Sequence, residues 1–154
     1  MAINGKYLTY KAMKENLKRA ITSEFYYEAI FIEYAILEDR LESLLRHAGV
    51  NVLDKNGHAI SYSNKVKVVK SNARFHDKFI MKKITSDFLD ELKSWSNKRN
   101  RLVHALAKMP YCNDSLKEVA LEGNELVKIF DNKVKSVNNY FDKNNHSYND
   151  KNTL

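Results

Sequence analysis

The chain has 154 residues, of which 44% are hydrophobic and 29% charged, and its formal net charge is +7. Its four glycines and one proline argue against a sandwich, a barrel or a loop-rich enzyme, so we expect one all-α domain over residues 1–154. The one cysteine, Cys112, excludes an internal disulfide. Because no apolar signal core or membrane span occurs, we expect a cytoplasmic protein with no membrane partner. The basic charge favours phosphate-rich partners, although a solubilising lysine-rich surface explains it equally well.

Helical spacing of apolar residues dominates the first third of the chain. It predicts a short helix over residues 7–18 and a longer one that is capped by Thr22 or Ser23, runs to about His47 and stops at Gly49. The apolar stripe of the longer helix consists of Tyr26, Ile30, Tyr34, Leu37, Leu41, Leu44 and Ala48. Such a stripe is typical of a helix that packs against a core.

One carboxylate interrupts that stripe, because Glu33 lies three residues after Ile30 and four before Leu37. In the second half of the chain, Arg99 interrupts another apolar stripe in the same way. Since a charge on an apolar surface needs a partner, the simplest arrangement is that Glu33 and Arg99 meet. Alternatively, Glu33 faces a solvated groove or pairs with Arg40.

Residues 50–63 break the helical pattern. The Asp-Lys-Asn-Gly sequence at 54–57 is a turn signal with apolar residues on either side of it. It predicts a short hairpin or an aqueous loop.

A basic tract follows this turn. It contains Lys65, Lys67, Lys70, Arg74, Lys78, Lys82 and Lys83. Tyr62, Phe75 and Phe79 are interspersed, so the tract could guide a polynucleotide and stack a base, with Arg74 and Lys78 as RNA contacts. Alternatively, the tract is only the solvated side of a helix.

Two further helices complete the pattern. Thr85 or Ser86 caps the first, which ends at Met109-Pro110, and Asp114 or Ser115 begins the second. Their apolar stripes are Phe88, Leu92, Trp95, Leu102, Val103 and Leu106, and Leu116, Val119, Leu126, Ile129, Phe130, Val137 and Phe141.

The predicted architecture is an antiparallel helical bundle of four to five helices. Its core covers about residues 20–141, where the apolar periods lie. Residues 142–154 are largely polar and without a period, and we expect them to form a flexible tail.

Six residues inside the first of the two later helices indicate a function: Arg99-Asn100-Arg101-Leu102-Val103-His104. They resemble the signature of the HEPN family, in which an Arg is followed by a polar residue and, after a short gap, by a His. The motif lies towards the end of its helix, and a long helix with an acidic residue in its apolar face precedes it. The resemblance covers most of the chain.

The resemblance implies a compact HEPN-like bundle that forms a homodimer in which two motifs face one cleft. Many members of the family are metal-independent endoribonucleases of toxin–antitoxin, abortive-infection and CRISPR-linked antiviral defence systems, whereas others only bind RNA or nucleotides. RNA as substrate and an antitoxin or another defence-system protein as partner are therefore implied. In one subgroup the antitoxin modifies a Tyr two residues after the His. Here that position is Leu106, so this control is not expected.

The motif residues suit cleavage of RNA, which carries its own nucleophile in the 2′-hydroxyl. His104 would be the general base or acid, because imidazole titrates near neutral pH. Arg99 would bind the phosphate oxygens as charge develops, and Asn100 would orient the imidazole or the phosphate. Five residues on a straight helix separate two side chains by about 140°, so Arg101, nearer to the face of His104, is the rival phosphate ligand.

Further residues are predicted to support this site. Glu33 would hold Arg99, and Lys98 and Lys108 would contact RNA on either side of the motif. No His or Cys has a second ligand at the spacing of a metal site, so neither a metal nor a cofactor is predicted. Two other functions stay open: a non-catalytic HEPN-like module that binds RNA or a nucleotide, and a structural bundle whose basic face meets an acidic protein.

Overall fold

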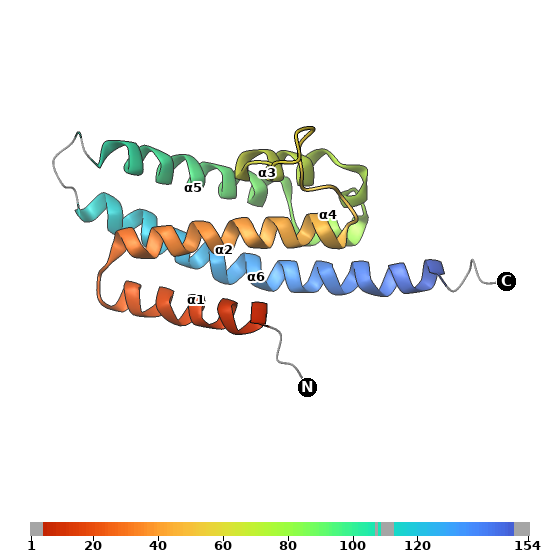
Figure 1. Cartoon of the computed structure of the whole chain (residues 1–154), viewed down its shortest axis with the longest axis horizontal. Coiled ribbons are helices and arrows are strands. Elements are labelled where there is room, and N and C mark those ends of the chain that lie inside the picture. Colours follow the sequence, from red (N-terminus) through yellow and green to blue (C-terminus); the bar gives the residue numbers. More distant parts are fainter. Residues whose placement is uncertain (1–4, 107, 109–112, 150–154) are drawn as a thin grey trace. The chain divides into compact units, whose positions relative to one another are not determined.

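The computed structural model is all-helical, and it describes residues 5–106, 108 and 113–149 (Figure 1). The helices in these residues are α1 (Gly5–Thr22), α2 (Tyr26–His47), α3 (Tyr62–Ser71), the 3-10 turn η1 (Ala73–Phe75), α4 (Lys78–Lys83), α5 (Ser86–Ala105) and α6 (Asn113–Asn149). The predicted all-α class and helical bundle are confirmed, with six α-helices where four to five were predicted. In the same residues, no helix has both the length and the apolar character needed to cross a membrane.

The boundary between α1 and α2 differs from the predicted one. α1 continues to Thr22, whose hydroxyl donates to the carbonyl of Lys18 at 2.8 Å, so Thr22 ends a helix and does not cap the next. Glu24 has a positive φ of 59° between the two helices, and α2 begins at Tyr26. The prediction failed because a hydroxyl residue can bond back to its own helix as readily as it can cap a following one.

The segment between α2 and α3 contains the predicted turn. The N–H of Asp54 donates to the carbonyl of His58 at 2.7 Å, and Gly57 supplies a φ of 78°. Leu53 and Ala59 form an isolated antiparallel bridge. No strand is present in the described part of the chain, so the turn has the form of a hairpin tip with arms that are too short to be strands.

α5 begins as predicted. Thr85 is its N-cap, and the Thr85 hydroxyl accepts a hydrogen bond from the N–H of Phe88 at 3.2 Å. The helix ends at Ala105, and the predicted stop at Met109-Pro110 lies outside the described residues.

α6 is longer than predicted. It begins at Asn113, one residue before Asp114, and continues to Asn149. Residues 142–149, which were expected in a polar tail, are therefore helical, because a helix that is already formed adds each further residue at little cost. Residues 150–154 lie outside the described part.

The chain divides into two compact units. Unit 1 comprises the described residues of 1–37 and 94–128, which are α1, the first part of α2, the last part of α5 and the first part of α6. Unit 2 comprises the described residues of 38–93 and 129–154, which include α3, η1 and α4. The motif of Arg99 and His104 therefore lies in unit 1.

Unit 1 has its own core, to which all four of its helical segments contribute. α1 and the first part of α2 run in opposite directions (Figure 1). Trp95 is completely buried, and its indole N–H donates to the carbonyl of Val119 at 3.0 Å. The other buried apolar residues include Leu17, Ala20, Tyr26, Ala29, Ile30, Ile36, Leu37, Leu116, Ala120, Leu126 and Val127.

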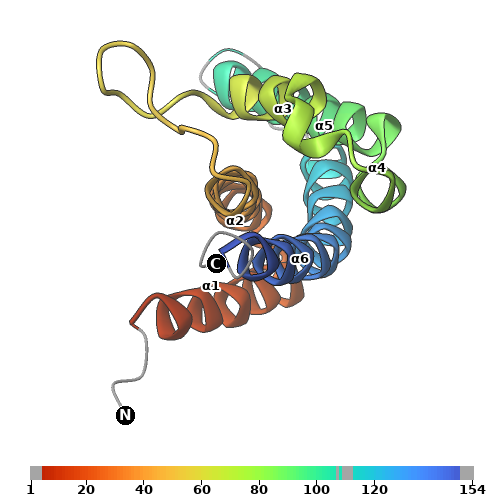
Figure 2. The ribbon, with the colours of Figure 1, turned by 90° about the vertical axis from the view of Figure 1, so that its right-hand side faces the viewer.

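Unit 2 has a second core. α3 lies beside the first part of α5 (Figures 1 and 2), where the hydroxyl of Tyr62 donates to the carbonyl of Leu92 at 3.1 Å. The rings of Phe75 and Phe141 meet edge to face, with centroids 5.8 Å apart. The other buried apolar residues include Leu41, Leu44, Leu45, Val66, Val69, Ile80, Phe88, Leu89, Phe130, Val134 and Val137.

Most residues of the predicted apolar stripes are buried, which confirms the helical period. The exceptions are Tyr34 and Leu102, which are half-buried, and Val103, Leu106 and Ile129, which are exposed. The stripe of α5 is therefore buried as far as Trp95 and reaches the surface beyond it, where the motif lies.

Candidate functional site

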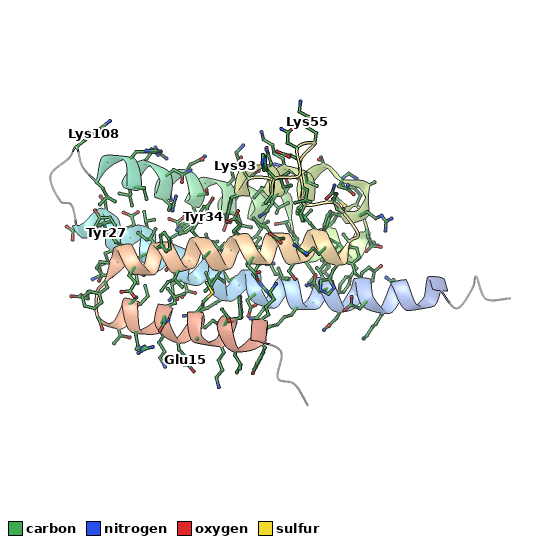
Figure 3. All side chains as sticks on the ribbon, in the orientation of Figure 1. Glu15, Tyr27, Tyr34, Lys55, Lys93 and Lys108 are labelled. Carbon is green, nitrogen blue, oxygen red and sulfur yellow. The ribbon has the colours of Figure 1, made fainter. Side chains whose placement is uncertain are left out.

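Arg99 is the best-defined member of the motif. Its guanidinium lies over the ring of Tyr34, which is labelled in Figure 3, with the central carbon 4.4 Å from the ring centroid. One terminal nitrogen, Nη1, donates to the side-chain oxygen of Asn100 at 3.0 Å. Among the described residues no carboxylate forms an ion pair with Arg99, and its buried Nε has no hydrogen-bond partner. An aromatic face and a neutral amide therefore position the cation without neutralising it.

Glu33 is not the partner of Arg99, and the predicted ion pair is wrong. The side chain of Glu33 is 0% exposed, and within the described residues neither carboxyl oxygen has a hydrogen-bond partner. Burial raises the pKa of Glu33 from 4.5 to about 9, so the group is a neutral acid at pH 7. The alternatives of a solvated groove and of a pair with Arg40 fail for the same reason.

The space for the Glu33 carboxyl is provided by a glycine in α6. A Cβ atom built on Gly123 would lie 2.7 Å from the carboxyl carbon of Glu33 and 2.8 Å from Cζ2 of Trp95. Both distances are too short for non-bonded atoms, so a side chain at this position would displace one of the two neighbours. The prediction failed because helical spacing gives the face of a residue but not the neighbour that its side chain reaches.

His104 is exposed near the end of α5, one turn after the exposed residues Asn100 and Arg101. Nε of Arg101 donates to the carbonyl of Asn97 at 3.5 Å, a long and weak hydrogen bond. In the described part of the chain no hydrogen bond or ion pair joins His104 to Arg99 or to Asn100. α5 is helical from Ser86 to Ala105, so the expected angle of about 140° between Arg99 and His104 persists.

The residues that were predicted to contact RNA lie in different surroundings. Lys98 pairs with both oxygens of Glu122, at 2.8 and 3.1 Å, so its charge is balanced. Lys108 is exposed after α5, and Arg74 and Lys78 are exposed in unit 2.

Within the basic tract of residues 65–83, part of the side chains that could have faced a polynucleotide are buried. Lys65 is 2% exposed and pairs with two carboxylates of α2. Tyr62 and Phe75 are buried in the core of unit 2, and Phe79 stacks on Tyr140 with centroids 4.6 Å apart. Tyr62 and Phe75 are therefore not available to stack a base, whereas Phe79 is 38% exposed, and stacking on Phe79 stays a prediction.

Two exposed aromatic residues, Tyr27 and Phe31, occur on α2 in unit 1, on the helix that also carries the half-buried Tyr34. Tyr27, Phe31 and Tyr34 follow the i, i+4, i+7 spacing of one helix face, and Phe31 is 69% exposed. Val103 and Leu106 follow Arg99 on α5 at the same spacing and are 41% and 48% exposed. The spacing was visible in the sequence, but the exposure of these residues was not, because apolar residues at helical spacing are usually buried.

No group of three or more His, Cys, Asp and Glu side chains is arranged to hold a metal ion in the residues that the structure describes. No family model, no curated protein and no solved structure matches the chain.

Proposed function

We propose that the protein is a metal-independent endoribonuclease of the HEPN type. The observation that carries the proposal is the state of Arg99: a cation positioned by Tyr34 and Asn100, with no carboxylate in the described residues to neutralise it. A positioned guanidinium without an internal counter-ion is suited to a phosphate, which accepts two of its N–H groups. His104, exposed on the same helix end, adds a group that transfers protons near neutral pH.

The reaction needs no metal ion, because RNA supplies the nucleophile. One imidazole removes the proton of the 2′-hydroxyl, and the oxygen attacks the adjacent phosphorus. Arg99 stabilises the charge that develops on the phosphate oxygens. The bond from phosphorus to the 5′-oxygen breaks, and a second acid gives that oxygen a proton. The products are a 2′,3′-cyclic phosphate and a 5′-hydroxyl.

The proposal includes a homodimer, since one chain carries one motif histidine and the reaction uses a base and an acid. Phe31, Val103 and Leu106 expose apolar surface on α2 and α5 around Arg99. Exposed apolar surface of this kind is typical of a site that a partner covers. A second copy that packs symmetrically on these residues would bring two copies of His104 to one cleft.

The biological role that we propose is that of a growth-arresting toxin or phage-defence effector in the cytoplasm, held in check by an antitoxin or another defence-system protein. It rests on the resemblance of the Arg99–His104 motif to the HEPN signature.

RNA cleavage by the full-length chain tests the activity. We expect cleavage to persist in EDTA and to fall at least 100-fold in Arg99→Ala and in His104→Ala, while circular dichroism stays unchanged. Arg46→Ala and His58→Ala, which remove exposed residues of the same types in unit 2, are the matched controls and should cleave normally. Retained cleavage by His104→Ala would rule out the assigned acid and base.

A second variant tests the dimer. Phe31→Lys places a charge in the proposed interface, so we expect a monomer in sedimentation and a loss of cleavage. Tyr7→Lys changes an aromatic residue of α1 that is 63% exposed and is the control. A dimer that survives Phe31→Lys would show that α2 is not the interface.

A non-catalytic RNA- or nucleotide-binding module is the second candidate. It is favoured by the absence of a hydrogen bond or ion pair between Arg99 and His104 in the described residues. It predicts binding of RNA that weakens steeply with salt and yields no cleavage product on a gel.

A further inference from the structure

A cavity in unit 1 lies between α1 and the first part of α6, and no residue of the Arg99–His104 motif lines it. Its volume is about 330 Å³, at the lower end of the range of about 300–1,000 Å³ that is usual for small-molecule sites. The cavity is partly open to solvent. It can therefore exchange a small ligand without unfolding the unit.

The floor of the cavity is aliphatic. Leu17 and Ile21, one helical turn apart on α1, face Val127 of α6 across it. Leu17 and Val127 are buried, so a ligand that covered the floor would complete a core that already exists. None of the described lining residues is aromatic, and the cavity therefore offers an aliphatic contact and no platform for stacking a base.

The rim of the cavity is cationic. Lys14 and Lys18 are one turn apart on α1, and Lys128 lies at the α6 side. No acidic side chain is among the described residues that line it. Lys128 pairs with Glu125 at 3.2 Å, but both side chains are more than 60% exposed, so this pair is weak and easily exchanged. Nζ of Lys14 lies over the ring of Tyr10, 4.9 Å from its centroid, so Lys18 and Lys128 are the rim lysines that the binding of an anion would use.

From this combination we propose that the α1–α6 cavity binds a small anion with an aliphatic body, such as a medium-chain carboxylate. The ammonium groups of Lys18 and Lys128 hold the charged head. The aliphatic body covers Leu17, Ile21 and Val127. This binding does not depend on the ribonuclease function, because the motif residues take no part in it.

The test is a titration of the full-length protein with octanoate, below the concentration at which it forms micelles, followed by amide NMR shifts. We expect shifts concentrated in α1 and the first part of α6. Octanol, with the body but no charge, and acetate, with the charge but no body, should each bind at least tenfold more weakly than octanoate, a difference of about 1.4 kcal/mol.

Variants separate a built site from general charge attraction. The double variant Lys18→Glu/Lys128→Glu changes two exposed residues and should weaken octanoate binding at least tenfold. Lys11→Glu makes one such reversal of charge on α1 outside the cavity and should bind octanoate as the unmodified chain does. Val127→Trp should fill the cavity and abolish binding, with the thermal midpoint as a check of folding.

Three outcomes would overturn the proposal. Equal affinities for octanol and octanoate would show that the lysines do not contribute to binding. Equal loss of affinity in Lys11→Glu would show attraction to the whole basic helix. Shifts scattered over the surface would mean an adventitious additive only. Since the double variant changes only exposed side chains, it decides the matter even if Val127→Trp fails to fold.

Discussion

Each unit of the molecule contains a buried side chain of a type that is normally charged, and the two units treat it differently. In unit 2, Lys65 lies 3.2 Å from a carboxyl oxygen of Glu38 and 3.3 Å from one of Glu42. In unit 1, Glu33 has no hydrogen-bond partner among the described residues and lies against Gly123 and Trp95. The ammonium of unit 2 thus has two acidic partners, whereas the carboxyl of unit 1 is kept neutral by its proton.

The difference teaches that the stability of the two units depends on different conditions. An ion pair between a buried group and partly exposed partners responds to the loss of either partner. The stability conferred by a neutral buried acid depends on pH, because ionising the acid without a partner lowers the free energy of unfolding. Substitutions and pH can therefore separate the two arrangements.

The largest expected effect is a loss of stability at alkaline pH caused by Glu33. Because the folded-state pKa of about 9 lies above the ordinary 4.5, the folded chain binds more protons than the unfolded chain between these values. The stabilisation from the protonated form is complete below about pH 4.5. Above this pH the unfolding constant rises about tenfold per pH unit, and the stabilisation is lost above about pH 9. Between pH 6 and pH 8 this amounts to about 3 kcal/mol.

Urea unfolding at a series of pH values measures this loss, with Glu33→Gln as the control. The variant cannot ionise, so its stability should lack the component that falls between pH 4.5 and pH 9. Parallel curves for the two proteins would mean that Glu33 titrates normally, and the contrast with Lys65 would disappear.

A smaller effect is expected from Gly123→Ala, which tests the packing around Glu33. The added methyl group meets the carboxyl of Glu33 and the ring of Trp95, and we expect a loss of about 2 kcal/mol of unfolding free energy. Gly5→Ala makes the same change where no atom lies within 4 Å and should be nearly neutral. In a Glu33→Ala background Gly123→Ala should cost less, because only the contact with Trp95 remains, and an equal cost in both backgrounds would contradict the contact with Glu33.

The smallest effects compare two lysines of α3. Lys65→Met removes the ammonium from between Glu38 and Glu42, which are themselves about a third exposed, and should cost about 1–2 kcal/mol. Lys70→Met removes the exposed pair with Asp90, at 2.8 Å, and should cost less than about 0.5 kcal/mol. Chemical denaturation at pH 7 measures both, and equal costs would show that burial adds nothing to the Lys65 pairs.

Much of the fold followed from local patterns in the sequence. The Thr85 cap and the buried residues Phe88, Leu92 and Trp95 of α5 were predicted, because caps and helical periods depend on neighbours along the chain. The end of α1 at Thr22 was not predicted, since the hydroxyl of Thr22 can either bond back to its own helix, as it does here, or cap the following helix.

The candidate site was predicted in part. Helical spacing singled out Glu33 and Arg99 as exceptions in their stripes, and both have unusual surroundings. It could not show that Arg99 reaches the ring of Tyr34, or that Lys65 turns inward to Glu38, because such contacts are made between helices far apart in sequence. The exposed Phe31 was missed because apolar residues at helical spacing are usually buried.

The lack of a side chain at Gly123 limits which substitutions this sequence can accept during evolution. Glycine inside a helix costs about 0.5–1 kcal/mol relative to alanine, so neutral change would tend to replace it. It is held here by the carboxyl of Glu33 and by the ring of Trp95, both of which a methyl group would meet. The two positions should therefore change together among descendants, with a shorter residue at position 33 appearing before any larger residue is accepted at position 123.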